Sequence, residues 1–219
     1  MTETCPVHPQ YSRAERIADA VVHGLGLVFG LAACISLAIL VWPHHDALLG
    51  LAVGLYGAGL LAMLTCSALY NLVDHSGWKP LFRRLDHAAI FVMIAGTYTP
   101  FMLVAVGGAR GLALLGFVWS VALAGVALKL IWPWRFERLS VAAYLLLGWS
   151  IVVVLDPLLG ALSAAGLALL LAGGLLYSLG VVFHLWARLP YHNAIWHAFV
   201  LVAAVCHFIA IVSEVVVAR

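Results

Sequence analysis

Charged side chains are scarce in this sequence. Only 9% of its 219 residues are Asp, Glu, Lys or Arg, whereas 65% are hydrophobic and the mean hydropathy is +1.11. A water-soluble globular domain carries about 25% charged residues, so the composition excludes that class. The net charge of +2 gives no sign of nucleic-acid binding. Walker loops, GxSxG elbows and Rossmann fingerprints are also missing, which removes the commonest soluble enzyme classes.

Disulfide and export signals are lacking as well. The four cysteines are scattered, so no disulfide framework is implied. Cys34, Cys66 and Cys206 lie within apolar runs and are expected to be small packing residues. Residues 1–16 are polar and lack the apolar core and cleavage site of a signal peptide. We therefore expect the first apolar run to remain in the protein.

Long hydrophobic runs are what the sequence has in abundance. A helix that crosses a bilayer needs about 20 mostly apolar residues, and these runs do not alternate polar and apolar residues as barrel strands do. The sequence predicts an all-α, polytopic membrane protein, with a tail over residues 1–16 and one seven-helix domain over residues 17–219. The expected spans are Ile17–Val41, Leu48–Val73, Asp86–Val106, Gly111–Trp132, Leu139–Leu158, Ser163–Trp186 and Asn193–Val217. Asp156-Pro157, with Gly160, is expected to separate the fifth span from the sixth.

The basic residues predict the orientation of the bundle. Nine of the eleven Lys and Arg residues fall on the side of the N-terminus, and only Arg110 and Arg219 fall on the other. The positive-inside rule then places the N-terminus in the cytoplasm and the C-terminus outside. Tryptophans near the span ends fit interfacial anchors. We expect a multi-pass protein of the cell membrane, which would be the inner membrane of a bacterium.

The polar residues of the apolar runs gather at one depth. Ionisable side chains are expensive in lipid, so they usually face the interior of a bundle or a water-filled site. Residues four apart share one helix face, and Ser67 and Asn71 have this spacing, as do Asn193 and His197. The side chains expected to meet in a cavity at the cytoplasmic side are Glu15, Asp19, His23, Ser67, Asn71, Asp86, His87, Asn193 and His197. His192 lies off the face shared by Asn193 and His197.

Several strings in the sequence resemble one known family. RLDHAAIF at residues 84–91, followed by IAGTYTPF at residues 94–101, is similar to the haemolysin III proteins, the bacterial branch of the progestin and adipoQ receptor (PAQR) family. AIWH at 194–197 with CHF at 206–208 resembles the last helix of that family, and SALY at 67–70 resembles its second. Glu15 and His23 match its first helix. The resemblance covers nearly the whole chain.

The resemblance implies a fold, a metal and an activity. It implies seven helices with a cytoplasmic N-terminus. It also implies zinc near the cytoplasmic face, held by three His, with an Asp and a Ser close to the metal-bound water. The relation of the family to alkaline ceramidases implies a metal-dependent lipid amidase.

The sequence departs from the family pattern at the metal ligands. The His of the second span corresponds to Asn71, and the first His of the last span corresponds to Asn193. The Asn often found in the first span corresponds to Asp19. Zinc prefers Cys, His and carboxylate donors, whereas amide oxygens suit harder ions. We therefore expect an altered site that holds zinc, another divalent cation, or a hydrogen-bond network without metal.

The resemblance implies hydrolysis of a lipid amide or ester, with a role for this reaction in membrane homeostasis. Ser67, Asp86 and His197 would position or deprotonate the attacking water. The expected metal ligands are Asn71, Asp86, Asn193 and His197. The expected surrounding or proton-relay groups are Glu15, Asp19, His23 and His87.

Other interpretations remain open. Asp86 could be a helix N-cap, and His197 could be a hydrogen-bonded core histidine. The bundle could be a receptor or sensor that binds a lipid without turnover. Ion or proton transport, or cytolysis, would need a polar path across the bilayer, and the outer half of the expected bundle has few ionisable residues.

Overall fold

A computed structural model describes residues 11–74, 77–132 and 135–218. Most of the predicted tail, as well as Arg219, lies outside the described residues. Within the described part the chain is helical and contains no strand. Seven helical segments among these residues are long and apolar enough to cross a membrane, which confirms the predicted all-α membrane fold.

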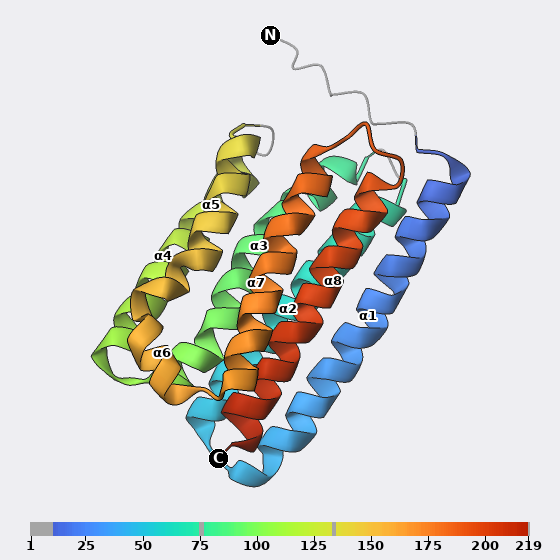
Figure 1. Cartoon of the computed structure of the whole chain (residues 1–219). Helices are drawn as coiled ribbons and strands as arrows, with labels where there is room; N and C mark the ends of the chain where they lie inside the picture. Colours follow the sequence, from blue (N-terminus) through green and yellow to red (C-terminus); the bar gives the residue numbers. More distant parts are fainter. Residues whose placement is uncertain (1–10, 75–76, 133–134, 219) are drawn as a thin grey trace.

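The helices run side by side in one bundle (Figure 1). Most of them begin and end within a few residues of the expected limits. The α-helices are α1 (Arg13–Val41), α2 (Ala47–Leu72), α3 (Lys79–Pro100), α4 (Gly108–Ile131), α5 (Glu137–Trp149), α6 (Leu155–Ala161), α7 (Ala164–Leu185) and α8 (His192–Ile211). The short segments are η1 (Trp42–His44), η2 (Phe101–Val106), η3 (Ser150–Val154) and η4 (Val212–Val217).

The fifth span is less regular than its sequence suggests. It consists of α5, a 3₁₀ segment at η3 and the short helix α6. Pro157 does not end the helix, because it lies in the first turn of α6, where its missing N–H costs nothing. The chain instead turns at Leu162 and Ser163, and the Ser163 hydroxyl caps α7. The predicted break is therefore correct in kind but lies a few residues further along.

Glycines allow some of the helices to approach closely. A methyl group at Gly59 of α2 would lie 3.2 Å from the Val92 carbonyl oxygen, and one at Gly96 of α3 would lie 3.1 Å from the Leu55 carbonyl oxygen. Small residues are the usual means of close helix packing in membranes. Helix α7 also packs along most of α8, whereas α5 touches α3, α4 and α7 over short stretches only. The α5 side of the bundle is therefore its loosest part.

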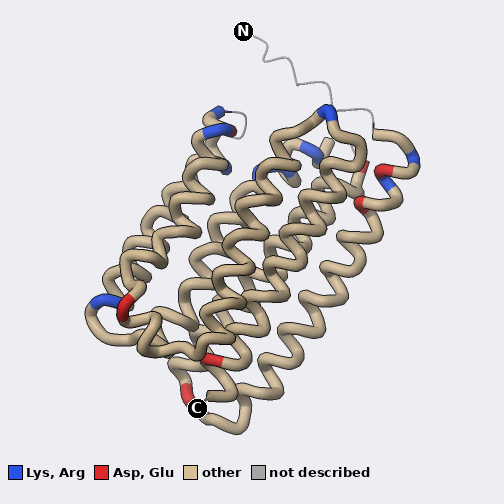
Figure 2. The backbone as a smooth tube through the Cα atoms, in the orientation of Figure 1, with Lys and Arg blue, Asp and Glu red and all other residues tan. Residues whose placement is uncertain are grey.

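The charged residues lie mainly at the two ends of the bundle (Figure 2). Most Lys and Arg gather at the end where α1 begins, and Arg110 belongs to the first turn of α4, which starts at the opposite end (Figure 1). This distribution is the one that the sequence predicts. The assignment of the basic end to the cytoplasm stays a prediction, and below it is called the N-terminal end of the bundle.

Candidate functional site

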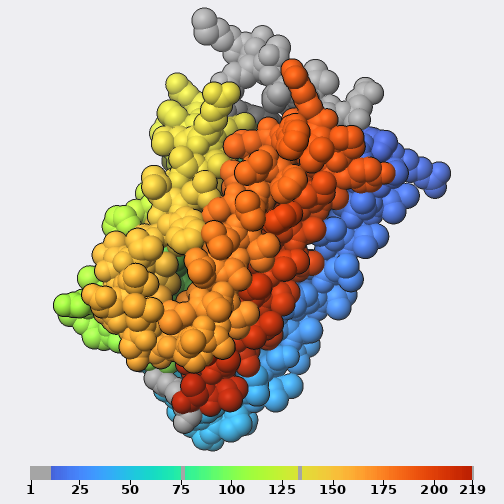
Figure 3. All heavy atoms as spheres, in the orientation of Figure 1, coloured from blue at the N-terminus to red at the C-terminus, as the bar shows by residue number. Residues whose placement is uncertain are grey.

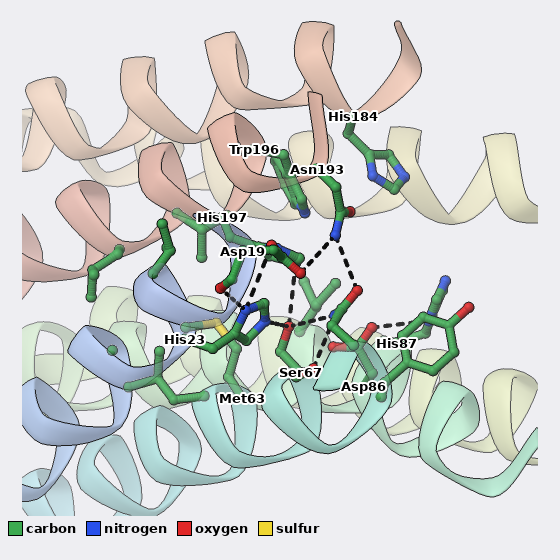
Figure 4. A pocket seen from close by; sticks show the side chains of 18 of the residues that line it. Asp19, His23, Met63, Ser67, Asp86, His87, His184, Asn193, Trp196 and His197 are labelled. Carbon is green, nitrogen blue, oxygen red and sulfur yellow. Dashed lines mark hydrogen bonds and ion pairs between the residues drawn. The ribbon is translucent and has the colours of Figure 1, made fainter. Parts of the chain in front are cut away.

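A cavity of about 1410 Å³ opens at the N-terminal end of the bundle. It is lined by side chains of α1, α2, α3, α5, α7 and α8, so helices from both ends of the sequence contribute to it. The polar residues predicted to meet at one depth all line this cavity. Figure 4 shows that several of them point toward one another from different helices. The prediction of a shared cavity is thus confirmed for α1, α2, α3 and α8.

Asp19 lies at the centre of the polar network. The residue is only 7% exposed. Its Oδ1 lies 2.7 Å from the Nδ1 atom of His197, and its Oδ2 accepts a hydrogen bond of 3.1 Å from the amide of Asn193. An ionised carboxylate only accepts hydrogen bonds, so the Nδ1 atom of His197 carries the proton. Asp19 therefore fixes the tautomer and the direction of the His197 ring.

Two imidazoles face the Ser67 hydroxyl. The Nε2 atom of His23 lies 3.3 Å from Ser67 Oγ, and the Nε2 atom of His197 lies 3.4 Å from the same oxygen. The Nδ1 atom of His23 donates to the main-chain carbonyl of Asp19 at 2.8 Å, because a carbonyl can only accept. Both neutral rings therefore present an Nε2 lone pair to Ser67. The rings also meet edge to face, with centroids 4.3 Å apart.

The two asparagines form a directed chain of hydrogen bonds. The amide nitrogen of Asn193 donates to Asp19 and also to Oδ1 of Asn71, at 3.1 Å each. The amide nitrogen of Asn71 in turn donates to the main-chain oxygen of Ser67 at 2.9 Å and contacts its hydroxyl at 3.5 Å. Both amide groups are thereby oriented by their partners. They hold Asp19 and Ser67 in place.

Asp86 and His87 lie about two turns into α3, on the side of the helix that begins at Lys79. Asp86 accepts a hydrogen bond from the Ser67 hydroxyl, so it belongs to the same cluster. It lies within α3, which begins at Lys79, and is therefore not the N-cap of this helix. His87 turns aside, because its Nδ1 atom donates to the main-chain carbonyl of Arg83 at 2.9 Å.

Glu15 acts at a different place from the one its spacing suggested. Its carboxylate accepts the N–H of Tyr191 at 2.9 Å and so ties the start of α1 to the residue before α8. Tyr191 itself has a φ of 61°, in the left-handed region. The hydroxyl of Tyr11 lies 3.4 Å from the Nε2 atom of His192, the first residue of α8. Burial, and then the charge of Asp19, raises the pKa of Tyr11, so its hydroxyl stays protonated at neutral pH.

Sequence reasoning placed Asp19 and His23 around the site, and the structure places both in contact with its centre. The regular spacing of Glu15, Asp19 and His23 showed that they share a face of α1. It did not show that this face lies between α2 and α8. Trp149, Tyr177 and His207 also line the cavity, and the spacing of polar residues in the sequence did not predict their place there.

The residues present do not fit the three-His zinc site that the family resemblance implies. Asn71 and Asn193 stand at two of the three ligand positions, and their amide nitrogens are occupied with donating hydrogen bonds. A different group is assembled from Asp19, His23 and His197. Each of these three can offer one ligand atom, and the three atoms lie within 4.8 Å of one another. This group could hold a metal ion through two imidazoles and one carboxylate, a donor set known in catalytic zinc sites.

Comparisons with known proteins agree with the resemblance. Residues 12–208 match the family model described as haemolysin-III related. The chain is 39% identical to Hemolysin-3 of Bacillus cereus over 215 residues, which covers 98% of each protein. It is 39% identical to the Hemolysin-3 homolog of Bacillus subtilis (strain 168) over 197 residues, or 90% of this chain and 92% of the relative. It is also 28% identical over 222 residues to the human monocyte to macrophage differentiation factor, covering 96% of this chain and 90% of that protein.

Proposed function

The chain belongs to the haemolysin III family of multi-pass membrane proteins, and on that premise we propose that it hydrolyses a lipid amide or ester. The observation that carries the proposal is the meeting of Ser67, His197 and two carboxylates, Asp19 and Asp86, in one cavity. A hydroxyl, an imidazole and a carboxylate in mutual contact are the groups that acyl-transfer enzymes use. The reaction would take place at the N-terminal end of the bundle.

The shape of the cavity supports a lipid as substrate. Its lining includes apolar residues, among them Ile90, Ile94, Leu145, Val181 and Val200. Charged residues of both signs line it as well, and Arg16, Lys79 and Arg83 are ion-paired with Asp74 or Glu137. An acyl chain would lie along the apolar residues, with a polar headgroup beside the charged ones and the bond between them beside Ser67.

The loose packing of α5 supports access from the bilayer. Figure 3 shows a hollow between the yellow segment of α5 and the orange segment of α7. Cavity-lining residues lie on both of these helices, Tyr144 and Leu145 on α5 and Gly174 and Val181 on α7. A lipid could slide sideways between the two helices, because only a few contacts hold them together. It would not have to leave the membrane.

Two forms of hydrolysis use the same side chains, and they differ in the group that attacks the carbonyl carbon. In the metal-dependent form, Asp19, His23 and His197 would hold a divalent cation such as zinc, which would supply Lewis acidity for the reaction. Ser67 and Asp86 then hold the attacking water by hydrogen bonds and accept its proton. In the second form Ser67 itself attacks, and this form is argued in the next subsection.

The test of the proposed hydrolase is an assay of purified protein in nanodiscs. The discs would contain defined phospholipids with a ceramide, and released fatty acids would be measured by mass spectrometry. Wild-type protein should release fatty acid, and His197→Gln should not, because it loses the imidazole whose Nδ1 atom lies 2.7 Å from the Asp19 carboxylate. His44→Gln, in the loop after α1, serves as the matched control and should match the wild type. Equal release by wild type and His197→Gln would refute the proposal.

A lipid receptor is the second candidate function, and the volume of the cavity favours it. A site of this size with an apolar wall can hold a lipid without cleaving it. In that case a lipid should co-purify intact with wild-type protein, and its amount should be independent of His197. Release of fatty acid that depends on His197 would decide against the receptor.

A further inference from the structure

We propose that Ser67 is a nucleophile that becomes transiently acylated, with His197 as its general base and Asp19 as the positioning residue of that base. This inference rests on the proposed hydrolase function and makes its attacking group specific. It replaces the attacking water of a metal-dependent reaction with a side chain of the protein itself. The expected substrates remain lipid amides and esters.

The contacts link Ser67, His197 and Asp19 in the order of a nucleophile, its general base and the acid that orients the base. Ser67 Oγ lies 3.4 Å from the Nε2 atom of His197, and the Nδ1 atom of the same ring lies 2.7 Å from Oδ1 of Asp19. Triads of Ser, His and Asp are recognised by this geometry and not by their order in the sequence. The contact between base and nucleophile is often somewhat long before substrate binds. Helices α2, α8 and α1 each contribute one member, so rigid elements hold the triad.

Hydrogen-bond directions favour transfer of the Ser67 proton to an imidazole. The amide nitrogen of Asn71 approaches Ser67 Oγ as a donor, at 3.5 Å, which leaves the hydroxyl proton for another acceptor. Asn193 binds the second oxygen of Asp19 and keeps the first oxygen directed at His197. The hydrogen bonds of the two asparagines therefore run in one direction, with Asn193 donating to Asn71 and Asn71 donating to Ser67.

His197 is better placed as the base than the other acceptors around Ser67. The Nε2 atom of His23 is equally near, at 3.3 Å, but the Nδ1 atom of that ring donates to a neutral main-chain carbonyl. Its distance to the Asp19 carboxylate is 3.6 Å, against 2.7 Å for His197. A carboxylate in contact with Nδ1 stabilises the imidazolium that forms when the ring takes a proton. Asp86 also accepts from the Ser67 hydroxyl, but a carboxylate that takes the proton becomes neutral and forms no cation for Asp19 to stabilise.

The proposed reaction has two balanced steps. In the first, Ser67 Oγ forms a bond to the carbonyl carbon, and its proton passes to Nε2 of His197. The bond from carbon to the leaving nitrogen or oxygen then breaks, and the leaving amine or alcohol takes that proton. In the second step water attacks the acyl-Ser67 ester while His197 accepts its proton. The ester bond breaks, Ser67 regains a proton from His197, and a fatty acid is released.

The structure also offers a donor for the negative oxygen that develops in both steps. The amide nitrogen of Asn71 lies 3.5 Å from Ser67 Oγ and is thus beside the carbon that this oxygen attacks. Side-chain amides serve as oxyanion donors in other hydrolases. Histidine at this position would be a metal ligand, whereas asparagine provides an N–H at the place where the oxyanion forms.

The test uses full-length protein in nanodiscs, a metal chelator and a long-chain alkyl fluorophosphonate. This probe forms a phosphorus–oxygen bond with an activated serine and loses fluoride. Intact mass and peptide mapping should locate one adduct on Ser67 of the wild type, and Ser67→Ala should form none. Ser120→Ala is the matched control, because Ser120 is an exposed serine of α4 outside the cavity and its hydroxyl donates to the Gly116 carbonyl. It should label at the wild-type rate.

Asp19→Asn tests the positioning role. The substitution should lower the maximal labelling rate by about a hundredfold or more, while the probe concentration for half-maximal rate stays the same. A merely structural defect would alter probe binding as well. Labelling of Asp19→Asn at the wild-type rate would overturn the role of Asp19, and absence of an adduct on wild-type Ser67 would overturn the inference as a whole.

The outcomes separate this inference from the proposed hydrolase function. If lipid hydrolysis occurs, is blocked by the chelator, and Ser67 stays unlabelled, the hydrolase stands and the nucleophile is wrong. If Ser67 is labelled only after zinc is added, Ser67 is a nucleophile but its activation by His197 and Asp19 alone is wrong. If Ser67 is labelled in the presence of chelator but no lipid is cleaved, the activated serine stands and the proposed substrate class is wrong.

Discussion

The Asp19→Asn substitution removes one negative charge and keeps the volume of the side chain. Asp19 accepts hydrogen bonds from His197 and Asn193, both on α8. After substitution, one amide oxygen can still accept from His197, but the new amide nitrogen then faces the amide nitrogen of Asn193. Two donors cannot pair, so the contact between α1 and α8 loses one hydrogen bond outright and the charge assistance of the other.

The expected cost follows from the membrane setting. An interhelical hydrogen bond in a membrane protein contributes about 0.6 kcal/mol on average, and bonds to ionised groups are about twice as strong. One such bond lost outright and the charge assistance of the other give a loss of about 2 kcal/mol in unfolding free energy. Reversible unfolding of purified protein in mixed micelles, followed by circular dichroism, would measure this loss.

Asp156→Asn is the control for this measurement. Asp156 is exposed and lies at the other end of the bundle from Asp19. It should change the unfolding free energy by less than about 0.5 kcal/mol, as is usual for a surface substitution. If Asp19→Asn were as mild as Asp156→Asn, Asp19 would not be an ionised acceptor between α1 and α8. The network described here would then be wrong.

Three further predictions concern the metal, the packing and the orientation. Protein purified without affinity-tag metal should gain stoichiometric zinc by elemental analysis when it carries Asn71→His with Asn193→His; no gain over the parent would show that these positions are not the family's ligand positions. Gly173→Ala should lower the thermal unfolding midpoint, because the added methyl would lie 2.3 Å from the imidazole Nε2 of α8, whereas Gly116→Ala, in open space, should not. A cysteine at His45 should react with a membrane-impermeant maleimide in intact cells, and protection of this cysteine would reverse the predicted orientation.

The sequence predicts the helices and the depth of the site well. Apolar runs of spanning length and the basic side of the chain are local properties, so one sequence suffices for them. The cluster of Ser67, Asp86 and His197 follows from the same reasoning, because each lies at the same end of its span. The 3₁₀ segment Ser150–Val154 has no such signal.

The partners within the site could not be predicted in the same way. The contact of Glu15 with Tyr191 spans 176 residues of sequence, and the spacing of polar residues on α1 does not say which helices α1 will touch. The central place of Asp19 depends on the position of α1 between α2 and α8, which packing of the whole bundle decides. Tertiary packing therefore determines which polar groups touch the Ser67 hydroxyl.

The junction of the first and the last helix has a consequence for biosynthesis. Asp19 enters the membrane early, while its partners on α8 are among the last residues to leave the ribosome. Throughout translation the early helices thus carry an acidic group whose neutralising contacts have not yet been made. A chain truncated before α8 would keep this group in lipid without compensation, a feature by which membrane proteases could distinguish unfinished molecules from complete ones.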